Sequence, residues 1–169
     1  QILVLLIGDE NVETLRPQHL GGRFELVRFV GRTLLIGADV SADFLSSESA
    51  HVLKSLVGGD PISGERKGVH ETVSLRGTYN VCVTSNVDMK IKLDGDRQAW
   101  ERRLLILDCS GQKPERRIPD FAAHLIKKEG PGLLRWAVEG AAQLLRAVDT
   151  SGTVTLSSNQ QARIDDLLS

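Results

Sequence analysis

Residues 79–86 read YNVCVTSN, and the rest of the chain can be interpreted outward from this stretch. Val81 and Val83 alternate along a short apolar run, which predicts a buried β-strand. The run ends abruptly in three polar residues, of which the last is Asn86. In open α/β sheets, ligand-binding groups lie just outside the carboxyl ends of the strands. This pattern makes Asn86 a candidate site residue.

Two further apolar runs carry charged residues at their ends. Residues 33–38 form a continuous apolar run, typical of a strand covered on both faces, and Asp39 follows it. Arg102 and Arg103 precede a third apolar run, residues 104–107, which is also predicted to be a strand. Taken singly, each polar residue has a simpler explanation as a turn residue or a solvated charge. Together they predict an acid, an amide and an arginine at one site.

Composition limits the class of protein. The chain has 169 residues, 41% hydrophobic and 25% charged, which is ordinary for one globular domain with a core. A formal net charge of −1 means that nucleic-acid contact needs a local basic patch. Cys82 and Cys109 fall in predicted strands and are expected to be reduced core thiols of a cytoplasmic protein. No apolar run is long enough to span a membrane, so no membrane partner is expected.

Between the strands that end in Asp39 and Asn86, the pattern predicts a helix and a hairpin. Apolar residues at helical spacing predict a helix over residues 48–58. Residues 62–75 alternate weakly around two glycines, which predicts a β-hairpin. Arg66 and Lys67 are expected near its tip, where ordinary solvation is the simplest explanation for a single basic residue.

The two ends of the chain are predicted to be mainly helical. Near the N-terminus the pattern predicts the end of a buried helix at residues 2–7, a loop with a helical turn at residues 9–22, and a short helix at residues 24–30. Near the C-terminus it predicts two helices, residues 120–129 and a second from Pro131, and then an amphipathic end at residues 157–169.

The sequence contains no complete catalytic or metal motif. Its four histidines are scattered, and neither cysteine has a partner at zinc-ligand spacing. Neither GxxxxGK[ST] nor GxGxxG occurs, so a complete phosphate cradle is absent from these residues. The polar strand ends fit other parts of a nucleotide site. Asp39 suits Mg²⁺, Asn86 can orient an attacking water, and Arg102 or Arg103 can neutralise developing charge in trans.

In this order, the motifs resemble those of superfamily 3 helicases, the AAA+ branch found in phage, plasmid and small-virus replication proteins. The closest resemblance is to the C-terminal helicase part of phage and plasmid primase-helicases. The matching stretches are GRTLLIGAD at residues 31–39 (Walker B), LKSLVGGDPI at 53–62 (the approach to the family's hairpin), VTSN at 83–86 (sensor 1), WERRLLIL at 100–107 (arginine finger) and LLRWAVEG at 133–140 (closing helix).

The resemblance implies an α/β fold in which a P-loop NTPase-like parallel sheet is sandwiched by helices. Residues 1–111 would be a partial AAA+ helicase core with a β-hairpin insertion, and residues 112–169 a C-terminal helical segment. The hairpin residues Arg66 and Lys67 would contact single-stranded or forked DNA in the channel of a homo-oligomeric, hexameric ring.

The resemblance also implies roles at an ATP and Mg²⁺ site. Asp39 would hold Mg²⁺ and Asn86 would act as the sensor. Arg103 would reach the neighbouring protomer's nucleotide in preference to Arg102, because Arg103 directly abuts the predicted strand. Asp39 stands where the family more often has Glu, and Asp43 or Glu48 would give at most weak assistance as a base.

The family's Walker A segment and its central first strand would precede Gln1. The chain is therefore expected to be a fragment of an ATP-dependent DNA helicase and not to hydrolyse ATP alone. An alternative is a non-catalytic prophage remnant, or an oligomerisation or DNA-binding module with the same fold. A third possibility, another P-loop NTPase such as a packaging motor, is disfavoured by the hairpin between the acid and the asparagine.

Overall fold

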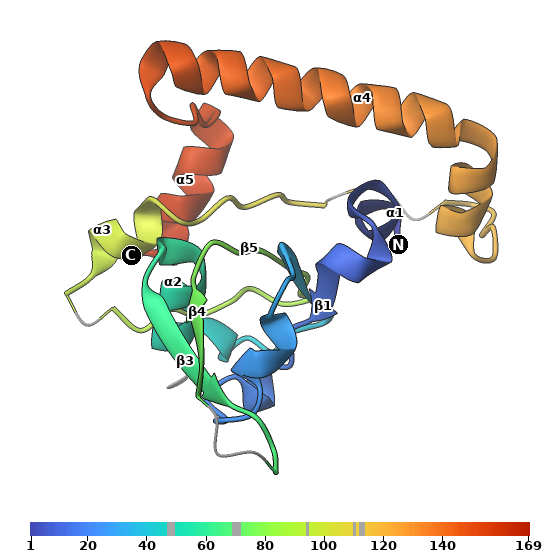
Figure 1. The fold of residues 1–169 in the computed structure, drawn as a ribbon. Coiled ribbons are helices and arrows are strands. Elements are labelled where there is room, and N and C mark those ends of the chain that lie inside the picture. Colours follow the sequence, from blue (N-terminus) through green and yellow to red (C-terminus); the bar gives the residue numbers. More distant parts are fainter. Residues whose placement is uncertain (47–49, 69–71, 94, 110, 112–113) are drawn as a thin grey trace.

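A computed structural model describes residues 1–46, 50–68, 72–93, 95–109, 111 and 114–169. At its centre is a parallel sheet in the order β1 (Val12–Thr14), β2 (Leu34–Gly37) and β5 (Asn80–Val83). Strands β3 (Pro61–Glu65) and β4 (Thr72–Arg76) form an antiparallel hairpin beside this sheet (Figure 1). The predicted mixed α/β fold, with a small parallel sheet and helices, is confirmed.

Strand β2 is central, and its sequence explains why. Leu34, Leu35 and Gly37 are buried, and the strand pairs on one side with β1 and on the other with β5. Leu35 lies opposite Val81 of β5, so the two predicted strands are direct neighbours. A strand enclosed in this way needs apolar residues on both faces, and the continuous apolar run at residues 33–38 supplies them.

Strand β1 lies within residues 9–22, where the sequence predicts a loop and a helical turn; the turn is present as the 3-10 helix η2 (Pro17–His19), but the strand is not predicted. It is three residues long, and two of them, Glu13 and Thr14, are polar. A segment this short shows no apolar alternation, so no local pattern marks it as a strand. Its strand geometry comes from pairing with β2, a pairing that Leu15 extends by donating its N–H to the carbonyl of Ile36 at 2.8 Å.

The helices predicted before and between the strands are present, but not all of them are buried as expected. Helix α2 (Ala50–Gly58) buries Leu53 and Leu56, while the expected start of this helix at Glu48 lies outside the described residues. The short helix predicted at residues 24–30 is the 3-10 helix η3 (Leu26–Phe29), which buries Phe29. Helix α1 (Ile2–Ile7) is present and ends at Gly8, but none of its residues is buried.

The predicted strand at residues 104–107 is wrong. Leu104 and Ile106 pack against the core, while Leu105 and Leu107 are 57% and 70% exposed. The segment thus has the alternation of a strand, but no strand pairs with it among the described residues. Apolar alternation cannot supply the hydrogen-bonding partner that a strand needs. Cys109, predicted to be a core thiol, is exposed, whereas Cys82 lies half-buried in β5.

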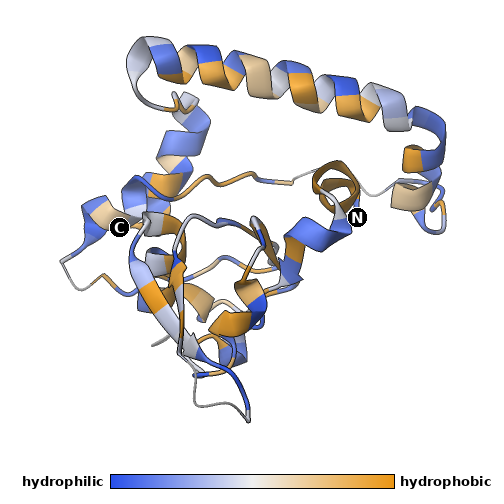
Figure 2. Ribbon diagram, in the orientation of Figure 1, coloured by the Kyte–Doolittle hydropathy of each residue, from blue (hydrophilic) through white to orange (hydrophobic). Residues whose placement is uncertain are grey.

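The two helices predicted after residue 120 are one helix, α4 (Phe121–Ser151), with Pro131 inside it. Figure 1 shows a sharp bend that separates a short first part of α4 from its long remainder. A proline inside a helix is a usual cause of such a bend, because it removes one hydrogen bond without always ending the helix. Helix α4 contacts α1, and hydrophobic residues recur along its length (Figure 2). Trp136 and Leu145 are among its exposed hydrophobic residues.

Helix α5 (Ser158–Leu167) returns the chain to the core. Ser157 caps it, and Ser157 and Gln160 form a reciprocal capping box. Ile164 and Leu168 are fully buried in the same cluster as the sheet residues. The C-terminal end is therefore part of the single core that the described residues form.

Glu25 is a buried carboxylate held by two arginines. Its side chain accepts hydrogen bonds from Arg16, one of them 3.0 Å long, and from Arg28 at 3.0 Å. Burial alone would raise the pKa of Glu25, but the hydrogen bonds and charges of Arg16 and Arg28 outweigh burial and lower the pKa below its usual value. Arg28 also pairs with Glu13 of β1, so the cluster joins η3 to the sheet.

The Glu25→Gln variant should lose about 1–3 kcal/mol of unfolding free energy at neutral pH, because it loses charged hydrogen bonds. A carboxyl with a lowered folded pKa stabilises above its unfolded pKa, and this contribution disappears as pH falls through the folded pKa. Urea denaturation from about pH 7 to about pH 3 should therefore show the two proteins converging. Glu139→Gln, on exposed α4, is the control. A difference that persists undiminished at the acid end would contradict the assignment.

Candidate functional site

Asp39 and Asn86 lie side by side at the ends of two adjacent parallel strands. Asp39 closely follows β2 and Asn86 closely follows β5. The Nδ2 atom of Asn86 donates a hydrogen bond to Oδ1 of Asp39 at 2.8 Å. The structure thus brings together the acid and the amide that the strand ends predict, and both residues are exposed to solvent.

Thr84 and Ser85 hold the two strand ends in register. Asp39 donates its backbone N–H to Oγ1 of Thr84 at 3.2 Å, and Val40 donates its own to the Thr84 carbonyl at 2.8 Å. Ser85 Oγ donates to the carbonyl of Val40 at 3.1 Å. Asp39 also has a φ of 50°, a left-handed conformation that Asp adopts more readily than most residues. Thr84 and Ser85 belong to the polar end of YNVCVTSN, but no local pattern predicts that they fix the two strand ends.

The Asp39–Asn86 pair offers oxygen ligands and a hydrogen-bond donor. An ionised carboxylate has about four acceptor sites, and the bond from Asn86 occupies one of them. No group of three or more histidine, cysteine or acidic residues that could hold a metal occurs among the described residues. A cation at Asp39 would therefore take its remaining ligands from water or from a substrate phosphate, as Mg²⁺ commonly does.

The structure does not bring either predicted arginine to this pair. Arg103 is half-buried, donates Nη1 to the carbonyl of Ala99 at 2.7 Å, and lies so near α2 that a β-carbon on Gly58 would be 2.7 Å from Nη2. Arg102 is exposed. No hydrogen bond or ion pair within the described chain joins either arginine to Asp39 or Asn86. An arginine that acts on a neighbouring molecule has to face outward, and Arg102 has the more suitable exposure.

The hairpin carries its two basic residues at an exposed position. Strands β3 and β4 form the predicted hairpin, with Ser63 opposite Ser74. Arg66 and Lys67 follow β3 and are exposed, and the remainder of the tip, residues 69–71, lies outside the described residues. Figure 1 shows the hairpin extending away from the parallel sheet. Because Arg66 and Lys67 are exposed, they are open to contact with another molecule.

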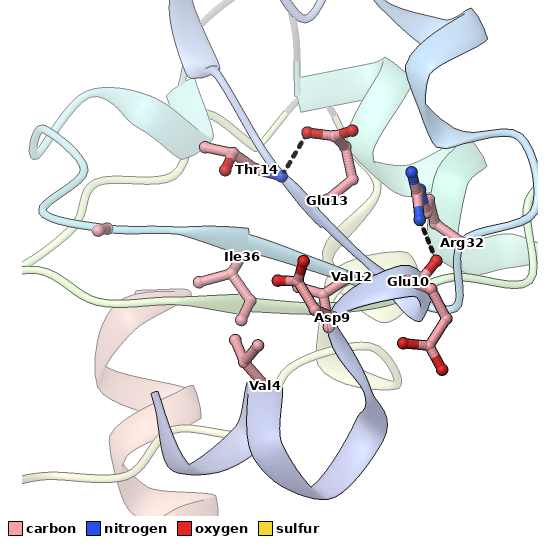
Figure 3. A pocket seen from close by; sticks show the side chains of 9 residues that line it. Val4, Asp9, Glu10, Val12, Glu13, Thr14, Arg32 and Ile36 are labelled. Carbon is pink, nitrogen blue, oxygen red and sulfur yellow. Dashed lines mark hydrogen bonds between the residues drawn. The ribbon is translucent and has the colours of Figure 1, made fainter. Parts of the chain in front are cut away.

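A separate pocket of about 710 Å³ lies between α1 and strands β1 and β2 (Figure 3). Asp9, Glu10 and Glu13 are among its lining residues, although the Glu13 carboxylate is paired with Arg28, and Arg32 donates to the backbone carbonyl of Glu10. Asp39 and Asn86 are not among the lining residues. Besides Glu13, the lining has two acidic residues, Asp9 and Glu10, and one arginine, a balance that disfavours an anionic phosphate, so this pocket does not suit a nucleotide.

Part of the chain matches a known protein family. A family model described as "Family of unknown function (DUF5906)" matches residues 1–103, which is more than half of the 169 residues. The matched range includes the Asp39–Asn86 pair, the hairpin and both arginines, and it excludes α4 and α5. No curated protein matches the chain. No helix in the described part of the chain is long and apolar enough to cross a membrane.

Proposed function

The chain belongs to the DUF5906 family, and we propose that it is part of an ATP-dependent DNA helicase of the superfamily 3, AAA+ type that serves phage or plasmid replication. The observation that carries the proposal is the 2.8 Å hydrogen bond from Asn86 to Asp39 at the ends of neighbouring parallel strands. In this proposal Asp39 holds Mg²⁺, directly or through water, and Asn86 orients the water that attacks the γ-phosphate of ATP.

The order of elements supports the same proposal. The hairpin β3–β4 lies between β2 and β5 in the chain, which is where superfamily 3 helicases are expected to insert their DNA-contacting hairpin. Arg66 and Lys67 are exposed near its tip and would bind the phosphate backbone of single-stranded or forked DNA. In a hexameric ring of such chains, the hairpins would line a shared channel.

The arginine segment would act between protomers. Arginine supplied in trans stabilises charge on the transferred phosphoryl group and can be worth about 10³–10⁵ in rate. Arg102 can do this from its exposed position, whereas Arg103 would first have to release the carbonyl of Ala99. Either arginine could therefore act in trans, and its exposure favours Arg102.

The proposal assigns the phosphate-binding loop to a part of the parent protein outside residues 1–169. ATP and Mg²⁺ would then bind between that loop and the Asp39–Asn86 pair. Because residues 1–169 include no complete phosphate-binding motif, the chain alone is expected not to hydrolyse ATP.

The test compares variants of the parent protein in an ATPase assay with single-stranded DNA. Asn86→Ala should lower kcat about 10²–10³-fold, because it removes a group that acts in the transition state. Asp39→Asn should lower kcat and raise the Mg²⁺ concentration needed for half-maximal rate. Asn159→Ala and Asp149→Asn, exposed residues of α5 and α4, are the matched controls and should retain the wild-type rate.

Two outcomes would contradict the proposal. One is an Asn86→Ala protein with an unchanged rate, and the other is ATP hydrolysis by residues 1–169 alone. If the parent protein hydrolyses no ATP but binds single-stranded DNA through Lys67, the non-catalytic DNA-binding module becomes the better explanation.

A further inference from the structure

Helix α5 contacts three segments that lie far from it in the sequence. Arg163 of α5 pairs with Asp88, which lies in the loop after β5, and with Asp108, which lies in the segment after Arg103. Gln161 donates to Glu101 of helix α3 (Arg97–Glu101) at 3.4 Å. Helix α5 therefore links the loop that carries Asn86 to the segment that carries Arg102 and Arg103.

Arg163 is the centre of these links. Its Nη2 atom lies 3.3 Å from Oδ1 of Asp88, its Nε atom 2.9 Å from Oδ2 of Asp108, and its Nη1 atom 2.9 Å from Oδ2 of Asp166. The close ion pair with Asp108 and the hydrogen bond to Asp88 raise the pKa of Arg163, which stays protonated at any ordinary pH. One guanidinium thus pairs with carboxylates from two separate segments.

The helix that carries Arg163 is itself firmly placed. Ile164, the next residue, is fully buried, and Leu168 is 1% exposed. Arg97 adds an ion pair to Asp165 at 3.1 Å and a hydrogen bond to the carbonyl of Leu168 at 2.7 Å. Arg163 therefore projects from a fixed support, whereas Asp88, at 94% exposure of its side chain, lies on an open loop.

We propose that Arg163 is a positioning residue, which holds the loop after β5 so that the Asn86 side chain stays against Asp39. Asp88 is two residues after Asn86, a separation of at most about 7 Å along the chain. A restraint on Asp88 therefore limits where the backbone of Asn86 can go. The consequence for catalysis rests on the proposed function, but the positioning itself does not.

Arg163 lies in α5, which follows residue 103 and so lies outside the range that matches the family. In this chain the C-terminal helix thus acts on a pair that belongs to the matched region. Through Asp108, the same guanidinium also restrains the segment that follows the arginines. Arg163 would therefore set the sensor loop and the arginine segment in one arrangement.

The test observes Asn86 directly in residues 1–169 and needs no nucleotide. The side-chain amide of Asn86 gives a signal in a ¹⁵N–¹H spectrum, which Asn86→Asp identifies by its loss. In Arg163→Gln, this signal should move toward the position of a solvated asparagine, and the Val87 amide should exchange about two- to fivefold faster, as expected for one exposed ion pair. Arg163→Lys should restore part of the wild-type spectrum, because it keeps the charge but not the fork of donors.

Arg97→Gln is the matched control, since it removes an ion pair and a hydrogen bond between α3 and α5 but no contact with Asp88. It should lower the melting temperature without moving the Asn86 signal. Asp88→Asn should reproduce the Arg163→Gln change, and the double variant should add little to either, which marks a direct coupling.

An Asn86 signal that stays in place in Arg163→Gln would overturn the proposal, and Arg163 would then be a stabilising contact only. Equal displacement of the signal by Arg163→Gln and Arg97→Gln would also overturn it, since any loosening of α5 would suffice. Neither result depends on ATP hydrolysis. Failure of the positioning role can therefore be told apart from failure of the proposed function.

Discussion

Gly77→Ala is expected to lower the free energy of unfolding by more than about 3 kcal/mol, at the upper end of the cost of overpacking a core. A β-carbon at this position would lie 1.7 Å from the carbonyl oxygen of Ser55 and 3.0 Å from that of Leu56. Both atoms are backbone atoms of α2, so no side chain can rotate to make room. The chain would have to move Gly77 or distort the helix.

Neither movement is available without loss of hydrogen bonds. Gly77 donates its N–H to the carbonyl of Asp60 at 2.9 Å and accepts from Gly59 at 2.7 Å. Two residues later, Tyr79 donates to the carbonyl of Leu56 at 3.0 Å, which places the start of YNVCVTSN against α2. A shift of Gly77 would therefore also displace β5 and with it Asn86.

Urea denaturation followed by circular dichroism measures this effect, and Gly140→Ala is the matched control. Gly140 lies inside α4 with no atom within 4 Å of the added β-carbon. Its replacement by alanine should raise stability by about 0.5–1 kcal/mol, because alanine is the better helix former. A Gly77→Ala protein with the wild-type midpoint would show that α2 and β5 are not packed as described.

The elements that the sequence predicts correctly are those whose signal is local. The apolar runs before Asp39 and Asn86 are long enough to mark β2 and β5 as strands, and the weak alternation between them marks the hairpin. Because parallel neighbours end at the same edge of a sheet, the contact between Asp39 and Asn86 also follows from topology. That part of the candidate site is predictable without coordinates.

The elements that the sequence does not predict depend on distant partners. Residues 12–14 become a strand only because β2 offers an edge, while residues 104–107 have the right alternation but no neighbouring strand in the described chain. Arg103 adjoins that apolar run in sequence, yet its guanidinium lies against the end of α2. Contacts between remote segments decide all three cases, and no periodicity within a segment reports them.

Helix α5 also packs against segments that are remote in the sequence, and loss of this packing should lower the free energy of unfolding. Ile164→Ala is expected to lower the free energy of unfolding by about 2–5 kcal/mol, because it removes buried methyl groups and leaves a cavity. Ile164 is fully buried in the cluster that also contains Leu35 of β2 and Leu56 of α2. The amphipathic pattern of residues 157–169 predicts a helix but does not show that one of its residues completes the core.

Ile118→Ala is the control of matched chemistry, since Ile118 is 46% exposed and the same atoms are removed. It should change stability by no more than about 0.5 kcal/mol. Urea midpoints compare the two variants, and hydrogen exchange at the β2 amides separates two explanations of any loss. If α5 completes the core, Ile164→Ala should speed exchange in β2 as well as in α5. If exchange rises in α5 alone, the helix is a detachable appendage, and the core formed by the sheet and α2 is stable without it.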